Sequence, residues 1–164
     1  MIPKYNQTKK SQMKNPKPYT SKPLKLNIEK LENNFARVDL EIHGIIHSGP
    51  SYEGRVFINN PDANANTKLD SLSGYAGSFH IFGHGGCFGD IGHCSVRPNK
   101  RPFDKRRQHH LTPAFKRITI TKMINKLPRS EFLVTIVPIL KATTDLCSVE
   151  DTIQFKKIKL VTYD

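Results

Sequence analysis

The run Val38-Asp39-Leu40-Glu41-Ile42-His43 alternates apolar and polar side chains at every position. Alternation with a period of two is typical of a strand that buries one face and exposes the other. Similar patterns, or short apolar runs between polar turns, occur at residues 54–59, 77–82, 116–123, 131–140 and 152–162. Because no helical pattern longer than a turn or two accompanies them, we predict an all-β domain, an antiparallel β-sandwich or a small barrel.

The charge of the chain is concentrated at its N-terminal end. The 164 residues carry a net charge of +12, and residues 1–25 contain seven lysines and no acidic residue. This segment has little to bury, so we predict a disordered lysine-rich tail over 1–25 and a single β domain over 26–164. A basic tail can bind nucleic acid, but we favour a solubilising role because the tail lacks arginine and clustered aromatic side chains.

Compartment and redox state follow from what the sequence contains. No run approaches the roughly 18 apolar residues that a membrane-spanning helix needs, and the first thirty residues have no apolar core of a secretory signal. We therefore expect a cytoplasmic protein without membrane contacts. The odd number of cysteines (Cys87, Cys94 and Cys147) does not fit a disulfide framework, although a Cys87–Cys94 bond stays open if the protein is exported.

The segment from Gly74 to Cys94 has the most chemically distinctive composition. Within it the candidate metal ligands are His80, His84, Cys87, His93 and Cys94, and His43, His47, His109 and His110 could add to them. Imidazole and thiolate together suit copper or zinc, and the glycines allow the backbone to fold tightly around one ion. The spacing matches no zinc-finger pattern. Two alternatives remain: histidines that only stabilise the sheet and its turns, or cysteines that are modified or joined.

The remaining candidates lie on strands and in the long irregular stretch 83–115. Tyr52 and Tyr75 could reach a partner surface or close turns over the core. Phe79, Phe82 and Phe88 are predicted core residues. A basic run in the irregular stretch offers anion-binding candidates at Arg101, Arg106 and Arg107. Pro138 predicts an edge position or a bulge, and a change of face at Lys156-Lys157 also predicts a bulge.

Several runs resemble the C-terminal β domain appended to certain microbial tyrosinase-like copper proteins. The most specific is Phe82-Gly83-His84-Gly85-Gly86-Cys87-Phe88-Gly89-Asp90-Ile91-Gly92-His93-Cys94. The others are residues 41–61, the rest of 74–94, 101–104, 111–113 and 134–138. The resemblance covers residues 36–162, nearly all of the predicted domain.

The resemblance implies a β-sandwich that packs against a helical catalytic domain carrying two coppers and that can cover the active site. A dicopper site of that type needs six histidines displayed mainly from helices. This chain has seven histidines, scattered over predicted strands and loops, and Gly83, Gly85 and Gly86 disfavour a helix at His80 and His84. We therefore expect a non-catalytic accessory domain that binds copper or zinc and associates with a helical copper-oxidase domain or subunit.

Two other functions remain open at this point. The chain could be a small independent metalloenzyme with a mononuclear His/Cys site, in which case a copper-dependent oxidoreductase is the expected class. It could also be a nucleic-acid-binding protein that acts through residues 1–25.

Overall fold

The predicted strands are present in the structure, a computed structural model that describes residues 16–26, 36–84, 103, 112–127, 131–140 and 152–163. In chain order the elements are β1 (Tyr19–Thr20), β2 (Leu24–Lys25), β3 (Arg37–Ile45), β4 (Tyr52–Ile58), β5 (Tyr75–Ile81), β6 (Ala114–Thr119), α2 (Thr121–Ile124), β7 (Glu131–Phe132), β8 (Val134–Leu140) and β9 (Lys157–Tyr163). Every strand pairing is antiparallel. The fold class predicted from alternation is therefore confirmed.

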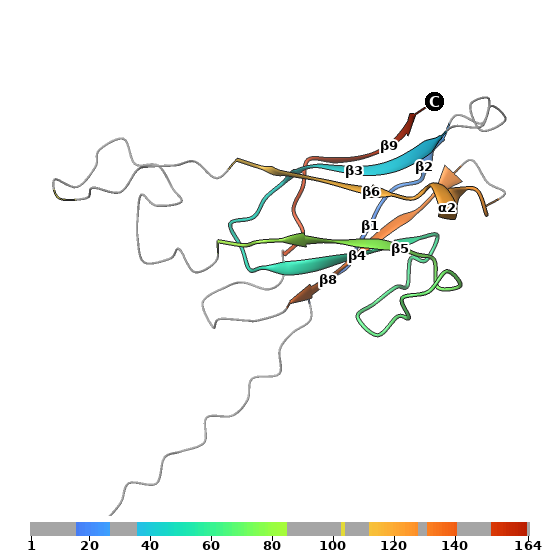
Figure 1. Cartoon of the computed structure of the whole chain (residues 1–164). Helices are drawn as coiled ribbons and strands as arrows, with labels where there is room; N and C mark the ends of the chain where they lie inside the picture. The colour runs from blue at the N-terminus through green and yellow to red at the C-terminus, as the bar shows by residue number, and fades with distance from the viewer. Residues whose placement is uncertain are drawn as a thin grey trace, which may run out of the picture.

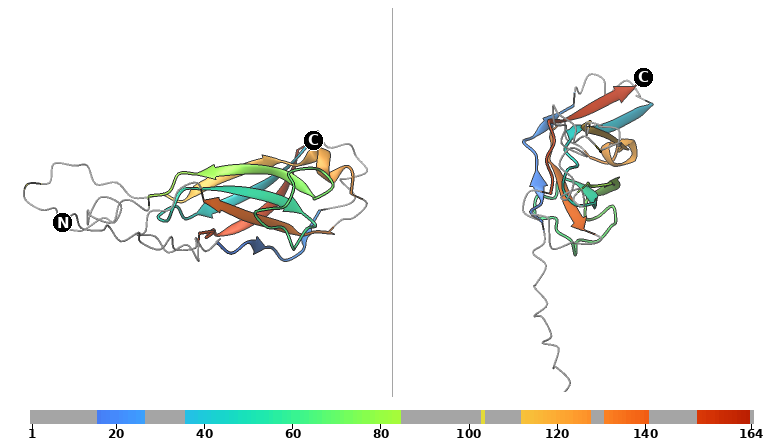
Figure 2. Two further views of the ribbon diagram at one scale, coloured as in Figure 1. Left: turned by 90° about the horizontal axis from the view of Figure 1, so that it is seen from below. Right: turned by 90° about the vertical axis from the view of Figure 1, so that its left-hand side faces the viewer.

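The strands form two layers that face each other (Figure 1). The first sheet has the order β1-β8-β4-β5, the second has the order β6-β3-β9, and β2 pairs with β7 in a short two-stranded ladder. Figure 2 shows the same strands from below and from one end of the sandwich. Neither sheet closes on itself over the described residues, so the architecture is the sandwich and not the barrel.

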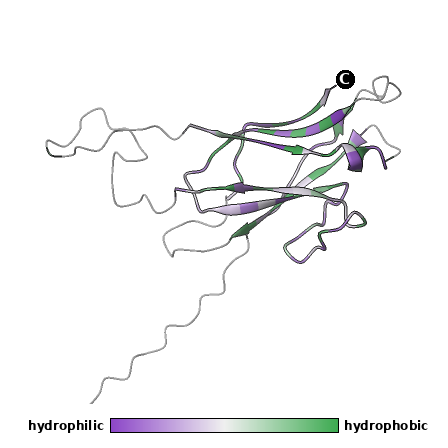
Figure 3. Cartoon of the chain, viewed as in Figure 1, coloured by the Kyte–Doolittle hydropathy of each residue, from purple (hydrophilic) through white to green (hydrophobic). Residues whose placement is uncertain are grey.

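The core lies between the two layers, and every second side chain of β3 points into it. Val38, Leu40 and Ile42 are fully buried, as are Val56 and Ile136 of the opposite sheet. Bands of opposite hydropathy alternate along β3 (Figure 3). Each such aliphatic side chain contributes about 1.5–3 kcal/mol when it leaves water, so the alternation that predicted the strand also supplies its stabilisation.

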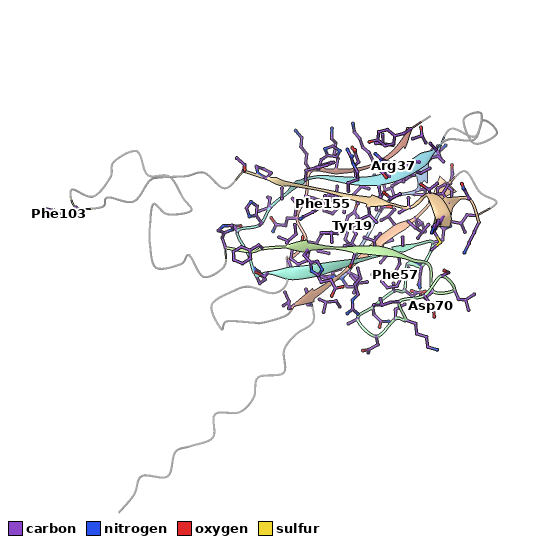
Figure 4. All side chains as sticks on the ribbon, in the orientation of Figure 1. Tyr19, Arg37, Phe57, Asp70, Phe103 and Phe155 are labelled. Atoms are coloured by element: carbon purple, nitrogen blue, oxygen red, sulfur yellow. The ribbon has the colours of Figure 1, made fainter. Side chains whose placement is uncertain are left out.

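The domain begins earlier in the chain than predicted. β1 and β2 both lie within residues 1–25, the segment expected to be a disordered tail. Tyr19 and Thr20 pair with Ile136 and Thr135 of β8, and the Tyr19 ring meets Phe155 edge-to-face at a centroid distance of 4.7 Å (Figure 4). The tail was predicted from its lysines, but Tyr19 and Leu24 within it lie on strands and pack against the core. Residues 1–15 and 27–35 lie outside the described residues.

Two irregularities of the sheets concern predicted positions. Among the described residues, β8 pairs with β4 along its whole length but with β1 only at Thr135 and Ile136. Within that part of the chain Pro138 thus lies where the strand is locally an edge and its missing N–H is tolerated. The predicted bulge at Lys156-Lys157 is not found, since β9 begins at Lys157 and pairs with β3 without a shift. A register shift occurs instead between β3 and β6, between His43 and Ile45, at Gly44 with φ 71°.

The connections complete the description. In the turn after β4, Asn59 is in the left-handed region at φ 55°, and α2 is a single helical turn after β6. No helix in the described part of the chain is long and apolar enough to cross a membrane.

Candidate functional site

One end of the sandwich brings together the loop between β3 and β4 and the chain that leaves β5. His47 lies in that loop, and His84 lies three residues beyond the last residue of β5. The backbone N–H of His84 donates to the carbonyl oxygen of His47 at 2.9 Å. The N–H of Gly83 donates to the Ser51 hydroxyl at 3.0 Å. These two hydrogen bonds fasten the segment after β5 to the loop.

Gly83 is required by this close approach. A Cβ atom at position 83 would collide with the carbonyl oxygen of Gly49 and with the carbonyl group of Pro50. Only glycine lets two backbone segments come so near each other. Gly83, a glycine of the segment from Gly74 to Cys94, therefore has a structural role, which is to bring His84 against His47.

The two imidazole rings contact each other directly. Their Nδ1 atoms are 3.1 Å apart, and the ring centroids are 5.0 Å apart at an interplanar angle of 65°. The other nitrogen of His47, Nε2, lies 2.8 Å from the carbonyl oxygen of Thr112, the residue before Pro113 at the start of β6. Because a carbonyl oxygen only accepts, His47 Nε2 carries a proton. In the neutral pair, His84 Nδ1 then donates to His47 Nδ1.

The other predicted metal ligands lie elsewhere or outside the described residues. His80 is exposed on β5 between the buried Phe79 and Ile81, so it faces away from the core. His43 Nε2 is 2.9 Å from the Glu41 carboxylate on the outer face of β3. Within the described ranges, no three or more His, Cys, Asp or Glu side chains gather into a group that could hold a metal. Cys87, His93, Cys94, His109 and His110 lie outside those ranges.

The three phenylalanines near this end have different environments. Phe79 is buried against the core, as predicted. Phe82 is 80 % exposed, so the prediction that it belongs to the core is wrong; its ring touches the His84 ring edge-on at a centroid distance of 5.9 Å. The alternation of β5 places residue 82 on the same outer face as Ser78 and His80, which explains its exposure. Phe88 lies outside the described residues.

The two tyrosines proposed as a partner surface pack within the domain. Tyr52 is 3 % exposed, and burial raises the pKa of its hydroxyl to about 12. The Tyr75 ring is partly buried and packs against Phe57 at a centroid distance of 5.6 Å. Tyr52 thus fits the alternative prediction, in which such a tyrosine closes over the core. Arg101, Arg106 and Arg107 are outside the described residues.

An ion-pair network on the outer face of the second sheet was not predicted. The Asp39 side chain is fully buried between Arg37 Nε at 3.1 Å and Arg117 Nε at 3.5 Å. Glu41 pairs with Arg117 at 3.2 Å and with His43. Burial opposes ionisation of Glu41, but hydrogen bonds from His43 and Arg117 outweigh it and lower the pKa of this carboxyl. Alternation placed the two acids and His43 on one face, which Arg37 continues two residues before Asp39 on the same strand. Arg117 comes from β6, at a position that only the register with β3 reveals.

The dicopper site implied by the resemblance does not fit the described residues. The histidines in those ranges lie on β3, on β5 and in the segments that follow these strands, and His43 and His80 belong to different sheets. Six histidines converging from helices have no counterpart there, since α2 is a four-residue turn without a histidine. What this end of the molecule offers is one imidazole pair beside an exposed aromatic ring.

Comparisons with known proteins bear on the fold. No family model and no curated protein matches the sequence. Among solved structures, a recombinant latent aurone synthase (polyphenol oxidase) co-crystallized with hexatungstotellurate(VI) matches 90% of this chain and 24% of its own, with a TM-score of 0.52 and 16% identity. The latent aurone synthase from natural source matches 94% of this chain and 25% of its own, with a TM-score of 0.50 and 18% identity.

This chain therefore spans about a quarter of the length of those structures. At such identities the likeness concerns the fold and not the activity. The chain has the β-sandwich fold of one part of polyphenol oxidase chains.

Proposed function

We propose that this chain is an accessory domain of the type found in tyrosinase-like copper oxidases, which covers the active site of a helical copper domain and is not catalytic alone. The observation that carries the proposal is the match of nine-tenths of this chain to only a quarter of latent polyphenol oxidases. The partner would then be the helical domain or subunit that supplies the copper chemistry. Copper or zinc binding by the histidine and cysteine cluster is the second part of the proposal.

The exposed end of the sandwich supports a covering role. Phe82 is 80 % exposed one residue beyond the end of β5, so its ring is available to a partner pocket that accepts aromatic rings. Its ring lies against His84, whose backbone is fastened to the loop that carries His47. Phe82 is thus presented on a braced segment, which lowers the entropy lost when a partner immobilises it.

The test uses an active polyphenol oxidase that lacks the matched quarter of its chain. This chain is added at increasing concentration while oxidation of a diphenol is followed by absorbance. We expect saturable inhibition, and at least about a tenfold weaker inhibition by Phe82→Ala, because a buried aromatic anchor contributes at least 1.4 kcal/mol to binding. Leu72→Ala is the matched control, since Leu72 is 99% exposed in the loop between β4 and β5.

Two results would contradict the proposal. Absence of both inhibition and binding at saturating concentrations, the latter measured by analytical ultracentrifugation, would remove the covering role. Diphenol oxidation by this chain alone after copper loading would instead identify an independent copper-dependent oxidoreductase.

A further inference from the structure

We propose that His47 and His84 chelate one divalent first-row metal ion through their Nδ1 atoms, with copper(II) bound more tightly than zinc(II). This deepens the metal-binding part of the proposed function and rests on that part alone. The candidate metal ligands are thereby reduced to two nitrogen atoms, which lie on two segments joined by hydrogen bonds.

The separation of the two nitrogens fits a shared metal ion. Metal–imidazole bonds are about 2.0–2.1 Å long, so two nitrogens on one ion are about 3.3 Å apart at a tetrahedral angle and about 2.9 Å apart at a right angle. The observed separation of 3.1 Å between His47 Nδ1 and His84 Nδ1 lies between these values. Tetragonal sites with near-right angles are typical of copper(II), which is also the most tightly bound ion of the divalent series.

The environment of His47 is that of an oriented metal ligand. Its Nε2–H donates to the Thr112 carbonyl oxygen at 2.8 Å, so the lone pair is on Nδ1, the atom that faces His84. Histidine ligands commonly donate their other ring N–H to a carbonyl or carboxylate, which fixes the tautomer and the ring orientation. Here the carbonyl belongs to the segment before β6, so three parts of the chain position one imidazole.

Metal binding requires a change of tautomer at His84 and no net release of a proton. In the neutral metal-free pair, the proton on His84 Nδ1 forms the hydrogen bond to His47 Nδ1. When the ion binds, this proton leaves Nδ1, and an equal proton is taken up at Nε2 from solvent. The rings rotate so that both Nδ1 lone pairs point to the ion, which lies off the line that joins the two nitrogens, and both rings remain neutral.

The backbone holds the two ligands near their binding positions before the ion arrives. The His84 N–H to His47 carbonyl hydrogen bond of 2.9 Å and the close approach at Gly83 fix the segments relative to each other. Such preorganisation reduces the entropic cost of binding. Two protein ligands leave the remaining coordination positions to water or to exogenous donors, so the site is an open one.

The other described histidines are unsuited to this site. His43 Nε2 is hydrogen-bonded to Glu41 on the outer face of β3, and His80 is exposed on the outer face of β5. His80→Ala is therefore a matched control: it removes a histidine four residues from His84 without touching the pair.

The experiment titrates the full chain with zinc chloride and copper(II) chloride. Ring ¹⁵N shifts measured by NMR with zinc distinguish Nδ1 from Nε2 coordination, and calorimetry gives both affinities. We expect Nδ1 shifts at His47 and His84, and a loss of at least about tenfold in affinity for His47→Ala and for His84→Ala. His80→Ala should bind as the wild type does. Circular dichroism checks that each variant is folded, and His47→Gln and His84→Gln replace any alanine variant that is not.

The inference is overturned if folded His47 and His84 variants keep wild-type affinity, or if the shifts identify Nε2 as the ligand atom. It is also overturned if Cys87→Ser or Cys94→Ser abolishes binding while the histidine variants do not. The inhibition assay is repeated with metal-free chain in the presence of a chelator. Inhibition that persists there while metal binding fails would remove this inference and leave the covering role intact.

Discussion

The outer faces of the two sheets differ, although both sheets bury equivalent inner faces. On the first sheet Phe57 and Val137 are almost completely buried on the outside as well, against Ala63 of the loop after β4 and Tyr75 at the start of β5. On the second sheet the corresponding face carries Asp39 and its partners. Figure 4 places Phe57 and Arg37 on opposite sides of the molecule.

This difference shows two ways to cover an outer face. On the first sheet Ala63 of the loop 59–74 and the Tyr75 ring of β5 cover Phe57 and Val137, so the stability of this face depends on apolar packing. On the second sheet, arginine guanidinium groups neutralise two carboxylates, and the aliphatic parts of the arginine side chains shield these carboxylates from water. Substitutions on the first face should therefore act through cavities, and those on the second through charge and pH.

The largest expected effect comes from Phe57→Ala. Phe57 is fully buried between the first sheet and its covering loop, so its removal leaves a cavity. We expect the free energy of unfolding to fall by about 3–5 kcal/mol in urea titrations.

Phe115→Ala is the control on the opposite face. Its ring is 46 % exposed and contacts the His43 ring and the Arg117 guanidinium. The expected loss is below about 1 kcal/mol. Equal losses for the two variants would show that the outer faces do not differ in the way described.

The next effect concerns Asp39→Ala. This substitution removes a fully buried carboxylate and leaves Arg37 and Arg117, each nearly half exposed, without their shared partner. Because both arginines can regain water, we expect a loss of about 1–3 kcal/mol rather than the full cost of a buried unpaired charge. Asp62→Ala, at an exposed turn position, should change the free energy of unfolding by less than about 0.5 kcal/mol. A stabilised Asp39→Ala protein would mean that desolvation outweighs the ion pairs.

The same comparison explains what the sequence could predict about the fold. On β3, alternation of Val38, Asp39 and Leu40 maps directly onto one buried and one charged face, so strand and facing were both predictable. In β8, Val134 through Val137 are buried on both faces because β4, the core and the covering loop all contribute. A continuous buried run shows that the strand is buried, but it does not show which side chains face the core and which face outward. β1 and β2 were missed because two-residue strands carry no periodicity.

The candidate site was predictable only in part. Composition drew attention to His84, and His47 was named as a possible addition, but their contact depends on the close approach at Gly83 and on the register that ends β5 opposite Tyr52. Composition also grouped His80 with His84 as candidate ligands. In the structure the imidazole that contacts His84 is that of His47, while His80 is exposed on β5.

A smaller effect should appear in the pH dependence of stability. Interactions with His43 and Arg117 lower the pKa of Glu41 from its ordinary value of 4.5. A lowered pKa adds stability above 4.5, and this contribution is lost as the pH falls below 4.5 through the folded-state value. Glu41→Gln should therefore be less stable than wild type at neutral pH, and the difference should shrink in acid. Unfolding curves measured across this range test it, and a constant difference would contradict the charge-based account.

The smallest effect is expected for Tyr52→Phe on the inner face of the first sheet. The Tyr52 hydroxyl is buried, and no partner for it occurs among the described residues, so removing it relieves a desolvation cost rather than breaking a bond. We expect the free energy of unfolding to change by less than about 0.5 kcal/mol. Ultraviolet titration should lose the tyrosine that ionises near pH 12 in the wild type. A loss above about 1 kcal/mol would reveal a hydrogen bond to this hydroxyl and a polar contact within an otherwise apolar layer.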